Sequence, residues 1–207
     1  MKYTKAIVIA SVAAASIAML GNAPTTGGEA EIGKAAPTFS LTDSNGKAVN
    51  LGDFKGKVVV LEWTNDGCPF VVGHYQGGIQ AMQKSYKKEG VVWLTIISSA
   101  EGKQGYADGK RANGLTKSRK ASPSYVLLDP TGKVGHQYDA KTTPQMYVID
   151  KAGVLRYDGA IDGSYSASAA KQKESDQFFT IALDSVLAGE KVKKAKTRPY
   201  GCSVKYK

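Results

Sequence analysis

The sequence predicts one α/β domain, in which a central mixed β-sheet is flanked by helices and preceded by a β-hairpin. Short β-branched apolar runs alternate along the chain with segments of helical periodicity. Turn residues separate two pairs of such runs closely enough to form hairpins. About 180 residues remain once an N-terminal leader is set aside, which is the length of one ordinary domain.

Residues 1–23 have the pattern of a cleavable signal peptide. Lys2 and Lys5 precede an uninterrupted small and apolar run, Ala6 to Leu20. This run of 15 residues is shorter than the roughly 20 residues that a membrane-spanning helix needs, and polar residues follow it. We therefore expect a periplasmic or secreted protein with no stable membrane anchor. Residues 24–36 are small, polar and glycine-rich, which predicts a linker.

The folded domain is expected over residues 37–190, and a hairpin opens it. Apolar and polar residues alternate around Leu41 and Val49, on either side of the turn Asn45-Gly46. Residues 58–61 are apolar without interruption and mostly β-branched. That pattern is typical of a central strand buried on both faces.

A helix in two parts follows that strand. The helical pattern begins at Pro69, is interrupted at Gly77-Gly78, and resumes from Ile79 to Tyr86. The rest of the chain predicts, in order, a strand over 91–97, a polar segment over 98–124 with weak helical periodicity, a strand over 125–128, a short helix over 133–138, a hairpin of 145–149 and 154–157, and a helix over 178–187 that ends before Gly189.

Positive charge is concentrated in two segments. The formal charge of +10 becomes +8 without the leader, because Lys2 and Lys5 are the only charged residues there. The excess lies mainly in residues 103–120 and in a basic C-terminal tail over 191–207. Surface lysines usually form a solvated face. No nucleic-acid partner is expected, because export removes that partner and neither segment contains a recognisable binding module.

The chain has two cysteines, Cys68 in the domain and Cys202 in the tail. In an oxidising compartment a Cys68–Cys202 disulfide is the default expectation. Closing a loop of about 135 residues would restrict the unfolded chain by about 5 kcal/mol, so a purely structural bond is credible. The position of Cys68 favours chemistry instead: at the start of a helix, free N–H groups and the helix dipole stabilise a thiolate, and Pro69 costs no hydrogen bond.

Four motifs follow one another along the chain: Ala36-Pro37-Thr38-Phe39-Ser40-Leu41-Thr42-Asp43 with Gly46-Lys47, then Phe54-Lys55-Gly56-Lys57 before Val58 to Glu62, then Cys68-Pro69, and finally Thr143-Pro144. In this order and spacing the sequence resembles the thioredoxin superfamily, and within it the redoxin or peroxiredoxin-like (AhpC/TSA-type) branch, over nearly all of residues 33–190. The resemblance implies a thioredoxin-like fold and a thiol oxidoreductase or antioxidant enzyme that needs no bound cofactor.

The resemblance also implies roles for the two cysteines. Cys68 would be the redox nucleophile. The dithiol site of the family would have its second cysteine at position 71, where this chain has Val71. Cys202 is therefore the candidate resolving cysteine, as in peroxiredoxins with a distant second thiol. Asn65 stands where peroxiredoxins usually have a threonine, which weakens the case for a peroxide substrate.

Five further residues are candidates for the site. Glu62 matches a buried acid that could relay a thiol proton, and the alternative is an edge glutamate that faces water. Pro144 matches the family's cis-proline, and Thr143 before it would pair with a substrate strand; an ordinary turn proline is the alternative. Trp63, like Pro69, is expected near the thiol, although Trp63 is equally well interpreted as core.

No metal site is expected, because His74 and His136 are isolated in the sequence, and a Cys68–His74 copper contact is the one alternative. The sequence leaves three functions open. The first is an oxidoreductase that exchanges disulfides with a thiol protein partner or reduces peroxide, with another thiol protein as electron donor. The second is a non-catalytic interaction module in which the Cys68–Cys202 bond is structural. A copper or haem metallochaperone is a third alternative.

Overall fold

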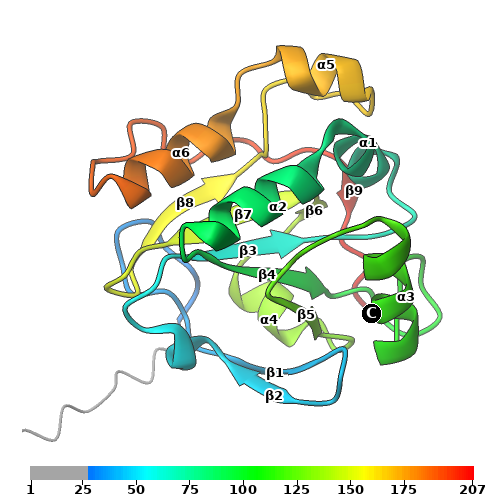
Figure 1. Ribbon diagram of the computed structural model, residues 1–207. Helices are drawn as coiled ribbons and strands as arrows, with labels where there is room; N and C mark the ends of the chain where they lie inside the picture. The colour runs from blue at the N-terminus through cyan, green and yellow to red at the C-terminus, as the bar shows by residue number, and fades with distance from the viewer. Residues whose placement is uncertain (1–27) are drawn as a thin grey trace, which may run out of the picture.

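The protein is described here by a computed structural model that covers residues 28–207, so the predicted signal peptide and the first four residues of the predicted linker lie outside the described residues. A seven-stranded sheet forms its centre, in the order β2-β1-β5-β4-β3-β7-β8 (Figure 1). The strands are β1 Ser40–Asp43, β2 Ala48–Asn50, β3 Val59–Trp63, β4 Val92–Ile97, β5 Tyr125–Leu128, β7 Gln145–Ile149 and β8 Leu155–Gly159. The predicted hairpins and central strand are confirmed.

The sheet is mixed, as predicted. Strands β3, β4 and β5 run parallel to one another, whereas β1 and β7 lie antiparallel to their neighbours β5 and β3. Every residue of β3 and β4 is buried, which explains their uninterrupted apolar character. A strand at the middle of the sheet therefore leads directly to Cys68.

Helices cover both faces of the sheet (Figure 1). On one face α1 Pro69–Gly77, α2 Ile79–Lys88 and α6 Phe178–Leu187 contribute to one apolar cluster with Val60 and Trp93. On the other face α4 Lys133–Gln137 and the first hairpin pack in a second cluster, which includes Val59 and Leu61. Gly78, with φ of 111°, separates α1 from α2 as the interrupted pattern predicts.

The polar segment over 98–124 contains one helix, α3 Gly109–Ser118. Its N-cap, Asp108, accepts a hydrogen bond from the Arg111 N–H, which explains where the helix begins. Three short elements were not predicted from the sequence: α5 Ala169–Glu174, β6 Thr142–Thr143 and β9 Cys202–Ser203, besides the 3₁₀ helix η1 Leu51–Phe54.

Both ends of the described chain lie against the domain. In the predicted linker, the Ala30 N–H donates to the Gln137 carbonyl oxygen at 3.1 Å. The C-terminal segment, red in Figure 1, crosses the domain to form β9, which pairs with β6. No helix within residues 28–207 is long and apolar enough to cross a membrane.

Candidate active site

Cys68 is the N-cap of α1, just beyond the end of β3. Pro69 follows in the first turn, where a missing N–H removes no intrahelical bond. The Cys68 side chain is fully buried. Its Sγ lies 3.1 Å from the carbonyl oxygen of Thr143, so the thiol contacts the β6 segment.

Thr143 and Pro144 lie opposite the thiol, as the resemblance implies. The Thr143–Pro144 peptide bond is cis, which excludes an ordinary trans turn proline. The strand that pairs with Thr143 is the chain's own β9. Thr143 lies opposite Cys202 and Thr142 opposite Ser203 in antiparallel register.

This pairing brings the two cysteines together from opposite ends of the domain. Cys202 is close enough to Cys68 for the two thiols to hydrogen-bond, and it is only half-buried. Both cysteines are free thiols in this structure. The Cys68–Cys202 disulfide therefore stays a prediction, although its two partners are adjacent.

The surroundings make the two thiols chemically different. Burial raises the pKa of Cys68, but hydrogen bonds to its thiolate from the Cys202 thiol, the Val71 N–H and the Thr143 hydroxyl outweigh burial and lower that pKa. Burial, and next the neighbouring Cys68, raise the pKa of Cys202 to about 11. Cys68 is thus the thiol that ionises first. Its contact with the Thr143 carbonyl belongs to the protonated form, since only a thiol can donate.

Glu62 is buried beneath α1 and α2, so the water-facing alternative is wrong. Its carboxylate accepts hydrogen bonds from Tyr75 (3.1 Å), Gln83 (3.1 Å), Trp93 (2.7 Å) and Thr95 (3.1 Å). Burial raises the pKa of Glu62, and these four donors oppose that effect. The carboxylate is fully engaged within the core, and its relay role stays a prediction.

Trp63 packs away from the thiol. Its ring belongs to the cluster on the α4 face, where it meets Tyr138 and Tyr147, whereas Cys68 belongs to the cluster on the other face. Its Nε1–H donates to the Ser98 hydroxyl at 3.0 Å. The core interpretation of Trp63 therefore holds, because alternate residues of β3 point to opposite faces of the sheet.

The segment over 98–124 contacts the loop before Cys68 through a hydrogen bond and an ion pair. The Asn65 side chain accepts from the Gly67 N–H (2.9 Å) and donates to the Gln104 carbonyl (3.2 Å). Arg111 of α3 forms an ion pair with Asp66. Asn65 thus uses its hydrogen bonds within the loop, in a position where peroxiredoxins usually have a threonine.

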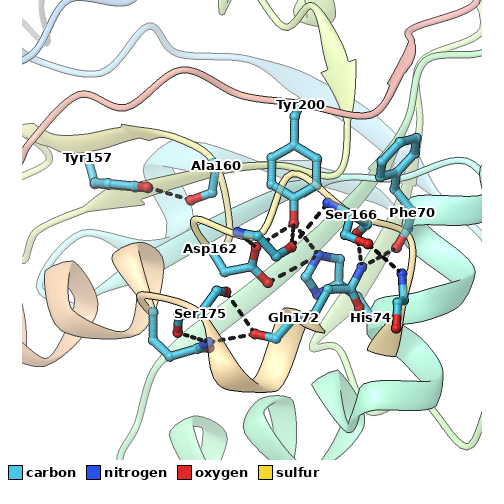
Figure 2. Close-up of polar contacts among 12 residues, drawn as sticks. Phe70, His74, Tyr157, Ala160, Asp162, Ser166, Gln172, Ser175 and Tyr200 are labelled. Atoms are coloured by element: carbon cyan, nitrogen blue, oxygen red, sulfur yellow. Dashed lines mark hydrogen bonds and ion pairs between the residues drawn. The ribbon is translucent and has the colours of Figure 1, made fainter. Parts of the chain in front are cut away.

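A buried polar cluster around Tyr200 was not predicted (Figure 2). The Tyr200 hydroxyl donates to the Asp162 carboxylate at 2.5 Å and lies 3.1 Å from both His74 Nε2 and Ser164 Oγ. Burial lowers the pKa of His74 to about 4 despite the nearby Asp162, so the imidazole is neutral at neutral pH. The sequence signal was weak: one tyrosine beside Gly201 and Cys202 in a basic segment.

His74 is engaged with Tyr200, and the predicted alternative of a Cys68–His74 copper contact gains no support from that geometry. His136 instead stacks on Tyr206. Within the described part of the chain, no three His, Cys, Asp or Glu side chains are grouped so that they could hold a metal ion.

Comparisons with known proteins agree with this geometry. The sequence profile of the AhpC/TSA family matches residues 32–158, a range that includes Cys68 and Pro144 but ends before Cys202. Chloroplastic peroxiredoxin Q of Oryza sativa subsp. japonica is 30% identical over 138 residues, which cover 63% of this chain and 59% of that protein. Thiol-disulfide oxidoreductase ResA of Bacillus thuringiensis subsp. konkukian is 29% identical over 123 residues, which cover 59% of this chain and 66% of ResA. The chain thus spans less than two thirds of either relative.

A solved structure is similar over more of the chain. The crystal structure of an uncharacterized conserved protein from Geobacillus kaustophilus matches with a TM-score of 0.72 and 27% sequence identity. The match covers 86% of this chain and 93% of that chain. The thioredoxin-like fold therefore extends well beyond the segment that the family profile matches.

Proposed function

Because the chain belongs to the AhpC/TSA family, we propose that it is a thiol–disulfide oxidoreductase in which Cys68 is the attacking sulfur and Cys202 the resolving sulfur. One observation carries the proposal. The β6–β9 pairing puts Cys202 opposite Thr143, whose carbonyl oxygen touches Cys68 Sγ. Both cysteines thus lie next to Thr143, and their side chains are near enough to hydrogen-bond, which is the proximity that a disulfide requires.

The different protonation of the two thiols gives them different roles. The Cys68 thiolate attacks one sulfur of a substrate disulfide, forms a mixed disulfide, and the departing thiolate takes up a proton. Cys202 then loses its proton and attacks Cys68 Sγ, which closes the Cys68–Cys202 bond and expels the second substrate thiolate. Two electrons pass from the cysteine pair to the substrate, and a thiol protein partner reduces the pair again.

Peroxide is a second candidate oxidant, supported by the similarity to peroxiredoxin Q. In that case the Cys68 thiolate takes one oxygen from the peroxide to become a sulfenic acid, and an alcohol or water leaves. Cys202 attacks the sulfenic sulfur, and water leaves as the bond closes. Asn65 faces the Gln104 segment, so it is not expected to assist this step.

Purified protein tests the proposal with two variants and two oxidants. Reduced protein should release thiol from a small aromatic disulfide and end with a Cys68–Cys202 bond. Cys202→Ser should stop at the mixed disulfide, and Cys68→Ser should lose turnover. Hydrogen peroxide consumption by the same three proteins distinguishes the oxidants. Full turnover by Cys68→Ser would overturn the proposal.

The structural-bond alternative predicts a different reduction potential. A purely structural Cys68–Cys202 bond should have a potential below about −300 mV and resist glutathione, whereas a catalytic one should be reduced more easily. Equilibration of the protein with glutathione buffers measures the value directly. A potential below that limit would favour the structural alternative.

We also propose that the protein acts outside the inner membrane. Lys2, Lys5 and the apolar run from Ala6 to Leu20 support this location. Cell fractionation of the full chain, with Ala6→Asp and Ile9→Asp together as the control, tests it. Cytoplasmic retention of the unaltered chain would contradict it.

A further inference from the structure

The segment that carries Cys202 is anchored on both sides of the cysteine. On one side the Tyr200 side chain is buried against α1 and the loop over 160–166. On the other side Tyr206 stacks on His136 with ring centroids 4.0 Å apart, and its hydroxyl donates to the Ala140 carbonyl at 2.7 Å. We call residues 200–206 the C-terminal strap.

Tyr200 links the two elements that bear the two sulfurs. Its ring meets Phe70 of α1 edge to face at 5.7 Å, and its hydroxyl contacts His74 one turn further along. Cys68 is the N-cap of that same helix, and Cys202 lies two residues after Tyr200. The cluster in Figure 2 therefore fixes the helix and the strap relative to each other.

The Tyr200 hydroxyl uses its full hydrogen-bonding capacity. It donates to the Asp162 carboxylate, and its oxygen can accept from the His74 Nε2–H and from the Ser164 hydroxyl. Hydrogen bonds to a carboxylate are shorter and stronger than neutral ones. Asp162 and His74 are buried, so loss of the hydroxyl leaves these two partners with little access to water that could replace it.

Gly201, between Tyr200 and Cys202, packs tightly against the segment that contacts Cys68. Its φ is +119°, and a Cβ at this position would overlap the Thr143 carbonyl oxygen. The backbone therefore packs directly on the residue that touches Cys68 Sγ. Because Gly201 is the one residue between Tyr200 and Cys202, the position of Tyr200 constrains that of Cys202.

We propose that Tyr200 is a positioning residue, which holds Cys202 beside Cys68 for closure of their bond by tying the C-terminal strap to Asp162 and His74. This inference rests on the proposed function, since it concerns the second step of the exchange. Tyr200 touches neither substrate nor the reacting sulfurs, so its effect is exerted through Cys202.

Closure can be timed separately from attack with an aromatic disulfide whose thiolate is coloured. Attack by Cys68 releases one coloured thiolate at a rate that depends on reagent concentration. Closure by Cys202 releases the second at a rate that does not. Tyr200→Phe keeps the ring packing and should slow only the second phase, by about tenfold or more, which corresponds to about 1.4 kcal/mol.

Two further variants provide a control and a second test of the same hydrogen bond. Tyr165→Phe is the matched control, because the Tyr165 ring lies 5.1 Å from the Tyr200 ring in a tilted arrangement but is exposed. This substitution should change the closure rate by less than about twofold. Asp162→Asn removes the charge from the same hydrogen bond and should slow closure less than Tyr200→Phe. The double variant should be slowed no more than the worse single one, because the two residues share one interaction.

The possible results separate this inference from the proposed function. If the Tyr200 hydroxyl only stabilises the fold, Tyr200→Phe should have a lower unfolding temperature and an unchanged rate of disulfide closure in the folded protein. That result would overturn the inference. If Tyr200→Phe does not fold, Asp162→Asn supplies the same comparison. If the unaltered protein shows no second phase at all, the proposed pairing of Cys68 with Cys202 fails instead.

Discussion

Formation of the Cys68–Cys202 bond should stabilise the protein by up to about 5 kcal/mol. The bond would close a loop of about 134 residues, and the entropy of closing such a loop in the unfolded chain gives that figure at room temperature. The folded state should add little cost, because Cys202 pairs with Thr143 and Thr143 contacts Cys68 while both cysteines are free thiols. Formation of the disulfide should therefore stabilise the protein mainly by lowering the conformational entropy of the unfolded chain.

The stabilisation that the disulfide provides should depend on pH, because the ionised Cys68 thiol stabilises the folded state of the reduced protein. The pKa of Cys68 is lower in the folded state than its ordinary value near 9. For a group with a lowered folded pKa, the stabilisation is present above the unfolded pKa and is lost as pH falls through the folded pKa. The oxidised protein has no Cys68 thiol to titrate. The difference between the two forms should approach about 5 kcal/mol in acid and become smaller toward pH 9.

Urea unfolding of the oxidised and reduced protein at several pH values measures this difference. Cys202→Ser is the control, since it cannot close the bond and should give the same free energy of unfolding with and without reductant. A difference below about 1 kcal/mol at every pH is within extrapolation error and would refute the argument. A difference that grows between acid pH and pH 9 would refute the assignment of the thiolate to Cys68.

Three further perturbations test other parts of the structure. Burial raises the pKa of Glu62, so its stabilisation is full below pH 4.5 and is lost as pH rises through the folded pKa, at up to about 1.4 kcal/mol per pH unit. Glu62→Gln should remove this slope from unfolding curves measured against pH, and an unchanged slope would exclude Glu62 as its source. Gly201→Ala should cost about 1–3 kcal/mol and speed amide exchange in β9, whereas Gly189→Ala, at φ of +73° with open space around it, should leave β9 intact. Arg111→Ala breaks a half-exposed ion pair with Asp66 and should change the unfolding free energy by less than about 1 kcal/mol; a larger loss would show that α3 is essential to the loop.

Most of the sheet and its helices could be predicted because their signals are local. Residues 58–61 are apolar on both faces of β3, and Gly78 interrupts the helical pattern where α1 ends. The two-residue strands β6 and β9 carry no such signal, since their partners lie about 60 residues apart in the sequence. Only their pairing, which depends on the finished fold, defines them as strands.

The residues of the candidate site also differ in whether they could be predicted from local sequence. Cys68 and Pro69 could be identified from their position, because the chemistry of a helix N-terminus depends on neighbouring residues, whereas Pro144 was identified through the family resemblance. The burial of Glu62 could not be decided, because its donors Trp93 and Thr95 lie on the adjacent parallel strand. An acid in an apolar run is ambiguous until the register puts Thr95 beside it.

Burial and acidity are distributed unequally between the two cysteines, and this difference has a mechanistic consequence. Cys68 has the lowered pKa but is fully covered, whereas Cys202 has the raised pKa and is partly exposed. Because Cys68 is fully buried, a substrate disulfide can reach its Sγ only after some of the segments packed around it move. Loss of the Cys202 hydrogen bond would raise the pKa of Cys68, so a smaller fraction of the thiol would be ionised, and each remaining thiolate would be a stronger nucleophile. Substrate access to Cys68 and the ionisation of Cys68 are therefore linked, because Cys202 contacts the Cys68 thiolate and lies on the strap that the hydrogen bonds of Tyr200 hold in place.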